Sequence, residues 1–403
     1  MSKKKILIIF LLLLIPYILL VLFIRQEAHN IESDIRLSDY PERHYIEERE
    51  EDKAEEKTTT TIERKEEFTK LPHQTTECLY RIKNIPSPKG LAFHPSGEEV
   101  WITSLMNKTN GVFIYDVITG EHIEGIQLPG GGGVEVIFNQ DGSFAYVSQM
   151  ETGRVFEIDT TSKEISRTLN TNSAWTKVMT IYEDYLFASN WSGNDISVIS
   201  LEGGHLIERI NTINTPRGII TANNNLYVAG FSNGEIQVIN LDSKSKEVVK
   251  TTGGAMRHIV ATSSKEYLYF SDMGQNEIHR LNTEDNTVDF FAKTEVNPNT
   301  ISLALDDKVL LVSNRGSNHP SGNYHIKGEE WGSIMIFDTA TGELLDVLLG
   351  GNQPTALDVH NEKSVFAYSN FLDGEVVVCR LPSYEELKNN EGASDYYHEY
   401  LSK

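Results

Sequence analysis

The feature that most constrains this chain is a sequence repeat of about 42 residues. Each unit contains an apolar strand that ends in a small residue, often followed by Asn or Asp. Successive strand ends are 45, 41, 40, 42, 42 and 56 residues apart, so the chain holds seven units. The strand ends are residues 101–103, 146–148, 187–189, 227–229, 269–271, 311–313 and 367–369. A sustained period of this length predicts a repeat architecture.

Each unit divides into four short strands bounded by turn residues. In the fourth unit these strands contain residues 218–220, 226–228, 236–239 and 247–249. Four antiparallel strands at this spacing are typical of a β-propeller blade, and the regular register disfavours a series of β-sandwiches. We therefore predict an all-β fold in which residues 78–381 form a seven-bladed β-propeller.

The seven units contain only six complete fourth strands before the pattern stops at Pro382. We expect the missing strand to come from residues 78–82, so that an N-terminal strand closes the last blade. When this blade is aligned with the sixth unit, Cys78 falls on Leu344 and Cys379 falls on Phe337, which should face each other across a hairpin. The two cysteines of the chain would then be opposed and could form a disulfide in an oxidising compartment. Two buried free thiols are the alternative.

A membrane anchor is expected before the propeller. Residues 6–24 are an uncharged apolar run of 19 residues, which as a helix spans about 28 Å, close to the thickness of a bilayer core. A cleaved signal peptide is the alternative, but the run is long and no small-residue cleavage site follows it. Three lysines precede the run and Arg25 follows it, so we expect a single-pass protein of the cell membrane with its N-terminus in the cytoplasm and the propeller outside.

The charge differs between segments of the chain. Residues 1–26, the cytoplasmic lysines and signal-anchor helix, carry +4, whereas residues 27–77 carry eight basic and 16 acidic residues. This second segment has too few apolar residues for a core and is predicted to be a charged stalk, disordered or partly helical. The remainder carries −18 of the total of −22, and its residues 382–403 form a polar C-terminal tail. This acidity argues against nucleic acid as a partner.

The repeats resemble the YVTN-type seven-bladed β-propeller family, close to the lactonase-like and surface-layer-type propellers. The matching segments are residues 88–97, 139–142, 189–190, 116–120 and 338–342. The resemblance implies the architecture, whereas members of the family have many functions.

In a propeller, the loops that link the fourth strand to the next first strand, and those that link strands two and three, share one face. Basic residues gather there at the start of the innermost strands. Lys89, Arg217 and Arg257 are equivalent in units one, four and five, and Lys177 and His258 are expected one position later, where unit two has Glu135. In a domain of charge −18, such cations predict a site for a carboxylate, phosphate or uronate. Pairing of each cation with a neighbouring acid or carbonyl is the alternative.

The sixth unit is about 14 residues longer than the others, and the extra residues lie within 315–332. Long loops in compact domains are often functional, so Asn314 and Arg315 at its start are candidate ligand-binding residues. His319, His325, Glu329 and Glu330 match no defined metal motif, and we predict neither a metal nor a cofactor. We interpret this insertion either as a rim or lid of the opening or as an ordinary solvated loop.

Tryptophans form the last group of candidates. Trp175, Trp191 and Trp331 lie in loops of the same face, where an aromatic ring can stack on a sugar or on a partner side chain. Packing between blades is the alternative for each of them.

Residues 253–259 resemble the Gly-Pro-Arg-His segment of lactonase-like propellers, although Met256 replaces the proline. The resemblance implies that Arg257 would stabilise an oxyanion and His258 would be the general base of a lactone or ester hydrolase. Our leading hypothesis is instead a binding module for an envelope ligand or a protein partner, because no stronger catalytic constellation is present. A scaffold subunit of an envelope complex is a third interpretation.

Overall fold

The computed structural model describes residues 62–64, 71, 74–107, 109–390 and 392–393. By their internal contacts, residues 318–326 separate from the compact unit that contains the other described residues. The predicted anchor at residues 6–24 and most of the predicted stalk lie outside the described residues. Within the described part, no helix has the length and apolar character needed to cross a membrane.

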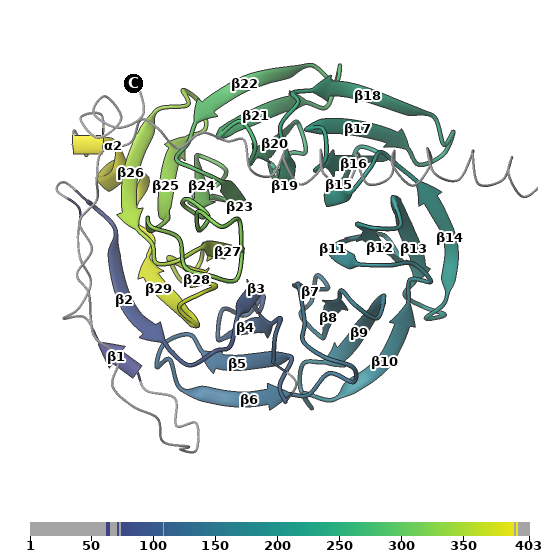
Figure 1. Cartoon of the computed structure of the whole chain (residues 1–403), viewed down its shortest axis with the longest axis horizontal. Helices are drawn as coiled ribbons and strands as arrows, with labels where there is room; N and C mark the ends of the chain where they lie inside the picture. Colours follow the sequence, from purple (N-terminus) through teal and green to yellow (C-terminus); the bar gives the residue numbers. More distant parts are fainter. Residues whose placement is uncertain (1–61, 65–70, 72–73, 108, 391, 394–403) are drawn as a thin grey trace, which may run out of the picture. The chain divides into compact units, whose positions relative to one another are not determined.

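The described strands of the larger unit form seven antiparallel sheets arranged as blades around a common centre (Figure 1). From the centre outwards, the first blade contains β3 (Pro88–Phe93), β4 (Glu99–Ser104), β5 (Val112–Asp116) and β6 (His122–Ile126), and the second contains β7 (Val136–Phe138), β8 (Phe144–Gln149), β9 (Arg154–Asp159) and β10 (Ile165–Asn170). The third contains β11 (Thr176–Tyr182), β12 (Tyr185–Asn190), β13 (Asp195–Ser200) and β14 (Leu206–Asn211), and the fourth contains β15 (Pro216–Ala222), β16 (Asn225–Gly230), β17 (Glu235–Asn240) and β18 (Lys246–Thr251).

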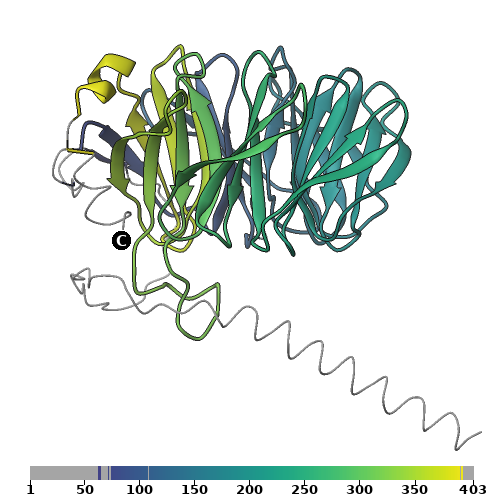
Figure 2. The same ribbon diagram turned by 90° about the horizontal axis from the view of Figure 1, so that it is seen from above.

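The fifth blade contains β19 (Met256–Ala261), β20 (Tyr267–Asp272), β21 (Glu277–Asn282) and β22 (Val288–Lys293), and the sixth contains β23 (Pro298–Ala304), β24 (Val309–Asn314), β25 (Ser333–Asp338) and β26 (Leu344–Leu349). The seventh contains β27 (Pro354–His360), β28 (Val365–Asn370), β29 (Glu375–Arg380), β2 (Glu77–Ile82) and β1 (Ile62–Arg64). The predicted seven-bladed all-β propeller is therefore confirmed. Figure 2 shows the strands running between two opposite faces of the ring, with loops on each.

The N-terminal strand closes the ring. β2 is the fourth strand of the last blade and pairs antiparallel with β29, with Cys78 opposite Cys379. The same register holds Phe337 opposite Leu344 in the sixth blade. A disulfide joins Cys78 to Cys379. β1, which falls inside the range assigned to the stalk, adds a fifth strand by pairing Ile62 with Ile82.

Hydrophobic side chains fill the spaces between neighbouring blades. Trp101, Tyr115, Phe156 and Tyr227 are among the largest side chains with almost no exposed surface. Burial of an aromatic or large aliphatic side chain contributes about 1.5–3 kcal/mol, so these interfaces supply much of the driving force for folding.

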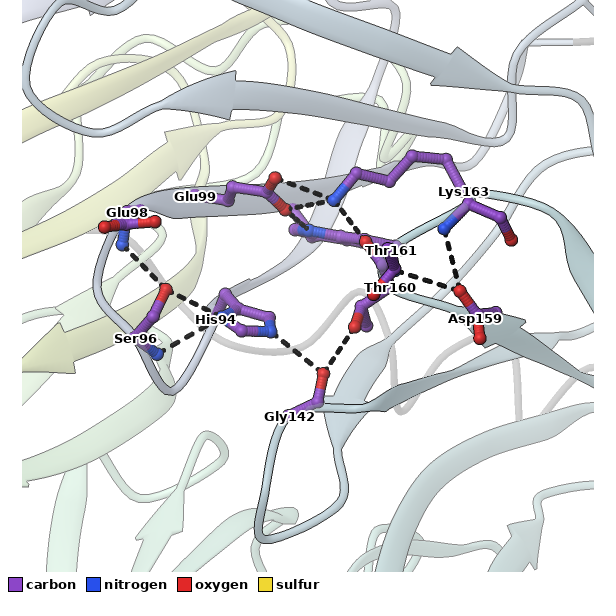
Figure 3. A network of polar contacts seen from close by, with 11 residues as sticks. His94, Ser96, Glu98, Glu99, Gly142, Asp159, Thr160, Thr161 and Lys163 are labelled. Carbon is purple, nitrogen blue, oxygen red and sulfur yellow. Dashed lines mark hydrogen bonds and ion pairs between the residues drawn. The ribbon is translucent and has the colours of Figure 1, made fainter.

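Polar contacts also join neighbouring blades. Figure 3 shows a network between the first and second blades, in which Lys163 Nζ lies 2.6 and 2.7 Å from the two oxygens of the Glu99 carboxylate. His94 Nε2 lies 2.9 Å from the carbonyl oxygen of Gly142, which also accepts a hydrogen bond from Thr160 Oγ1 at 2.6 Å. The ammonium group of Lys163 in the second blade is therefore neutralised by a carboxylate of the first blade.

Segments from both ends of the propeller cover the outer strand of the sixth blade. The short helix α2 (Tyr384–Lys388) begins at Ser383 with a capping box, and its Leu387 is buried with Leu345 and Leu348 of β26. Before β2, the backbone N–H and the Oγ1 hydroxyl of Thr76 donate to Asp346 Oδ2 at 2.7 and 2.6 Å. As a result β26 is almost entirely buried, unlike outer strands such as β14.

Candidate functional site

A β-bulge interrupts most of the innermost strands near their first residue. The pairing register shifts in β3, β11, β15, β19, β23 and β27, between Pro88 and Leu91 in β3 and between Pro216 and Ile219 in β15. A bulge leaves backbone groups unpaired and re-aims the side chains beside it. The residues at this point of each blade surround the centre of the ring, because the innermost strands do (Figure 1).

The small residue that ends the second strand of a unit satisfies the backbone of this bulge. Ser189 Oγ accepts a hydrogen bond from the N–H of Val178 at 3.0 Å and donates one to the carbonyl of Arg217 in the next blade at 2.9 Å. Ser148 likewise donates to the carbonyl of Lys177 at 2.7 Å. The hydroxyl is thus a bridge between adjacent innermost strands, and it explains why a small residue recurs there.

These hydroxyl bridges define the true register of the candidate residues. The bridging hydroxyls of Ser148 and Ser189 bind the carbonyls of Lys177 and Arg217, so these two residues are equivalent. The expectation that Lys177 falls one position later is therefore wrong. The segment from Thr171 to Lys177 is one residue longer than the equivalent segment from Thr212 to Arg217, so counting along the chain places Lys177 one position too late. Glu135 and His258 do occupy the later position; the N–H of His258 donates to Ser271 Oγ at 3.1 Å.

Glycine occupies the later position where the neighbouring strand comes closest. A Cβ on Gly90 would lie 2.6 Å from the carbonyl oxygen of Val134 in the next blade. A Cβ on Gly218 would lie 3.0 Å from the carbonyl oxygen of Arg257. The side chains that the inner strands can present towards the centre are therefore limited by close backbone approach.

Five cations come together at the centre of the propeller. Burial lowers the pKa of Lys89 well below its ordinary value, and the charges of Arg257, Arg315, Arg217 and Lys177 lower this pKa further. Each of these four must lie close enough to Lys89 for its charge to act, although they come from four other blades or their loops. We call Lys89, Lys177, Arg217, Arg257 and Arg315 the cation ring. The sequence predicted all five as ligand-binding residues, and their convergence is a result of the fold.

Several of the contacts that hold the ring residues are neutral. The Arg257 guanidinium donates through Nε to the Asn299 amide oxygen, and Arg315 Nη2 donates to Gln353 Oε1 at 2.8 Å. Lys89 Nζ lies 4.9 Å from the centroid of the Phe371 ring. The sequence analysis missed Gln353 and Phe371 as neighbours of the ring, whereas Asn299 stands at the same repeat position as Arg217.

Lys177 has an aromatic environment. Its Nζ lies 5.2 Å from the ring centroid of Trp175, 5.1 Å from that of Trp191 and 3.0 Å from Met150 Sδ. Burial lowers the pKa of Lys177 to about 6, and Arg217 and Arg257 contribute to this shift. No ion pair joins Lys177 to a carboxylate among the residues that the structure describes.

Glu135 is the acidic member of the site. Its Oε2 accepts a hydrogen bond from the N–H of Met179 at 3.0 Å. Burial raises the pKa of Glu135 to about 7, while Arg217, the Met179 hydrogen bond and Arg257 act in the opposite direction. With a pKa of about 7, this carboxyl group is about half-protonated near neutral pH.

His258 lies between the fifth and sixth blades. Its Nδ1 accepts a hydrogen bond from the N–H of Ile301 in β23 at 3.4 Å. Burial lowers the pKa of His258 to about 3, with Arg217 and Arg257 adding to the effect. The imidazole is therefore neutral over the physiological pH range.

The remaining candidates have different surroundings. Asn314 is fully buried, and its Nδ2 donates to Ser333 Oγ at 3.2 Å within the sixth blade. Trp331 is 40% exposed and makes no aromatic or cation–π contact with a described residue. Glu330 accepts a hydrogen bond from Ser317 Oγ at 2.7 Å. His319 Nδ1 lies 2.8 Å from Ser321 Oγ. Across the described ranges, no three His, Cys, Asp or Glu side chains are grouped so that they could hold a metal ion.

Comparisons with known proteins support the fold more firmly than a family. No protein-family model matches the chain, so the YVTN-type assignment stays a resemblance. The chain is 32% identical over 263 residues to Antigen Lp49 of Leptospira interrogans, an alignment that spans 62% of this chain and only 57% of that protein. A chain of the hydrazine synthase of Kuenenia stuttgartiensis superimposes with a TM-score of 0.61 at 16% identity, covering 74% of this chain and 96% of that one. This last likeness shows the propeller fold alone.

Proposed function

We propose that this chain is a non-catalytic binding module whose propeller takes up an anionic ligand at the cation ring. In this proposal the N-terminal apolar run anchors the protein in the cell membrane, and the propeller faces the outside. The ligand is a carboxylate, a phosphate or a uronate, carried by an envelope component or by a partner protein.

The observation that carries the proposal is that the charges acting on the central lysines and on His258 are positive. The charges that shift the pKa values of Lys89, Lys177 and His258 by Coulombic interaction are all cationic. Cations that repel one another in a partly buried site cost folding free energy, and an anion bound among them offsets this cost. Such a cost is reasonable if the site exists to bind an anion.

The contrast with the rest of the domain supports this interpretation. Residues 78–403 carry −18, so a group of basic side chains at the centre differs in sign from the domain that contains it. A local excess of positive charge inside an acidic domain concentrates anions at one place and leaves the outer surface repulsive to them.

The external location is supported by the sequence and is compatible with the similarity to a protein named an antigen. The apolar run, the preceding lysines and the disulfide between Cys78 and Cys379 agree with a single-pass protein whose propeller lies in an oxidising compartment.

The hydrolase alternative has less support from the geometry. A general base is most effective when its pKa lies near the working pH, whereas the pKa of His258 is lowered to about 3. The Nδ1 atom of His258 is also engaged by a backbone N–H. Binding therefore explains the Arg257–His258 pair better than proton transfer does.

Isothermal titration calorimetry on the full-length chain, with sulfate, phosphate and D-glucuronate as ligands, tests the proposal. We expect at least one of these anions to bind, and the Arg217→Gln/Arg257→Gln variant to lose at least tenfold in affinity. Arg380→Gln is the control, because Arg380 pairs with Glu386 on an exposed surface at 3.1 Å and should leave affinity unchanged.

Two results would overturn the proposal. One is the absence of binding for all three anions, and the other is unchanged affinity in the double variant when circular dichroism shows it to be folded. A lactone-hydrolysing activity that disappears in His258→Ala would favour the hydrolase instead.

A further inference from the structure

The cation ring is continuous with an aromatic group, formed by Trp175, Lys177 and Trp191 in the third blade. Lys177 belongs to both, since its Nζ lies 5.2 and 5.1 Å from the two indole rings while its charge is coupled to Arg217 and Arg257. The two tryptophans come from different loops of the blade, one before β11 and one after β12. A hydrogen bond of 3.0 Å from the N–H of Trp191 to the carbonyl of Trp175 holds them together.

Trp175 is both exposed and conformationally strained. Its side chain is 44% exposed, and its φ of 62° lies in the left-handed region that a bulky residue rarely adopts. Trp191, by contrast, is half-buried and packs on Phe231 with ring centroids 4.7 Å apart. The same left-handed φ recurs directly before the innermost strand in other blades, at Ser87, Thr215, Asn297 and Gln353, so it is a feature of the repeat turn. Here the strained backbone holds an exposed indole beside the lysine.

A flat apolar face next to a group of fixed cations matches the chemistry of a carboxylated sugar. The C–H face of a pyranose stacks on an indole, and the carboxylate of a uronic acid binds ammonium and guanidinium groups through charge-assisted hydrogen bonds. A free inorganic anion uses only the cations. An acidic peptide would use the cations as well but gains little from a stacking ring.

We propose that the ligand of this propeller is an acidic saccharide, whose carboxylate enters the cation ring and whose sugar ring stacks on Trp175. This inference rests on the proposed anion site and specifies the ligand class. Trp175 is accordingly a specificity-determining residue that discriminates sugar acids from other anions.

The test compares galacturonate oligosaccharide, sulfate and an oligoglutamate peptide by calorimetry on the full-length chain and on Trp175→Gly. Glycine removes the indole and also accepts the positive φ, so this variant should keep its thermal stability. We expect Trp175→Gly to lose about tenfold in affinity for the oligogalacturonate and to bind sulfate as the unchanged protein does. Phe290→Ala, which removes a similarly exposed aromatic ring on the outer strand β22, should bind all three probes normally.

Different failures separate the two proposals. If Trp175→Gly binds oligogalacturonate as tightly as the parent, or if oligoglutamate binds at least as well as the saccharide, the saccharide inference is wrong although the anion site stands. If sulfate binding also persists in Arg217→Gln/Arg257→Gln, the anion site itself is wrong. Restoration of most of the oligogalacturonate affinity in Trp175→Phe would support stacking, because phenylalanine keeps a flat aromatic face.

Discussion

Replacing both cysteines with alanine is expected to destabilise the propeller substantially. The disulfide between Cys78 and Cys379 closes a loop with a sequence separation of 301 residues, almost the whole domain. The loop-entropy relation for an unfolded chain of this length gives about 6 kcal/mol. Because real unfolded chains are more compact than that relation assumes, we expect a loss of about 3 to 5 kcal/mol in the free energy of unfolding.

Urea denaturation followed by tryptophan fluorescence measures this loss. With an m value of about 3 kcal/mol/M, the midpoint of Cys78→Ala/Cys379→Ala should lie about 1 to 1.7 M below that of the parent. The parent protein in reducing agent should fall to nearly the same midpoint, whereas the double variant should not respond to reducing agent.

The reasoning also makes a chemical prediction that can refute it. Alkylation of the denatured, non-reduced protein should modify neither cysteine, and mass spectrometry detects each added group. Two alkylated cysteines would show that the thiols are free, and an equal effect of reducing agent on the double variant would show that the stabilisation has another origin.

Four further predictions concern the centre of the propeller. Ser189→Ala should cost about 1–3 kcal/mol of stability, measured by thermal unfolding, because it leaves the buried N–H of Val178 without its hydroxyl acceptor; an unchanged melting temperature contradicts this role. Gly90→Ala should cost about 1–3 kcal/mol through its clash with a backbone carbonyl, and a crystal structure without displacement of the adjacent strand would argue against it. Sulfate should bind more tightly as pH falls from 8 to 5.5, since Glu135, with a pKa of about 7, and Lys177, with a pKa of about 6, then take up protons. Calorimetry across this pH range tests this expectation. An affinity for sulfate that does not change with pH would contradict the anion site. For Lys177, whose pKa is lowered on folding from 10.5, the same protonation reduces stability in the absence of an anion, so the anion-free melting temperature should rise between pH 6 and pH 9 and rise less in Lys177→Met.

Much of the candidate site could be predicted from the sequence, because alignment of the seven repeats gives each residue a position within its blade. Once seven units are aligned, Lys89, Arg217 and Arg257 stand at one position and the cysteines stand opposite each other. The error for Lys177 has a specific cause. The segment from Thr171 to Lys177 is one residue longer than the equivalent segment from Thr212 to Arg217, and nothing in the local sequence marks where the extra residue is accommodated.

The partners of the cations were the larger omission. Asn299, Gln353 and Phe371 contact Arg257, Arg315 and Lys89 across blade boundaries. Such contacts depend on side-chain directions at the innermost strands, where backbone approach is close. Sequence periodicity carries no information about these directions between units.

The sequence by itself determined the number of blades, the strand that closes the ring and the pairing of the two cysteines. These features follow from local alternation of apolar residues, from turn residues and from the count of strands, all of which repeat along the chain. Only the tertiary structure decided how closely the predicted basic residues converge, which neutral groups contact them, and that two tryptophans flank Lys177. Convergence is a property of ring closure, which brings residues 89 and 315 together although 226 positions separate them in the chain.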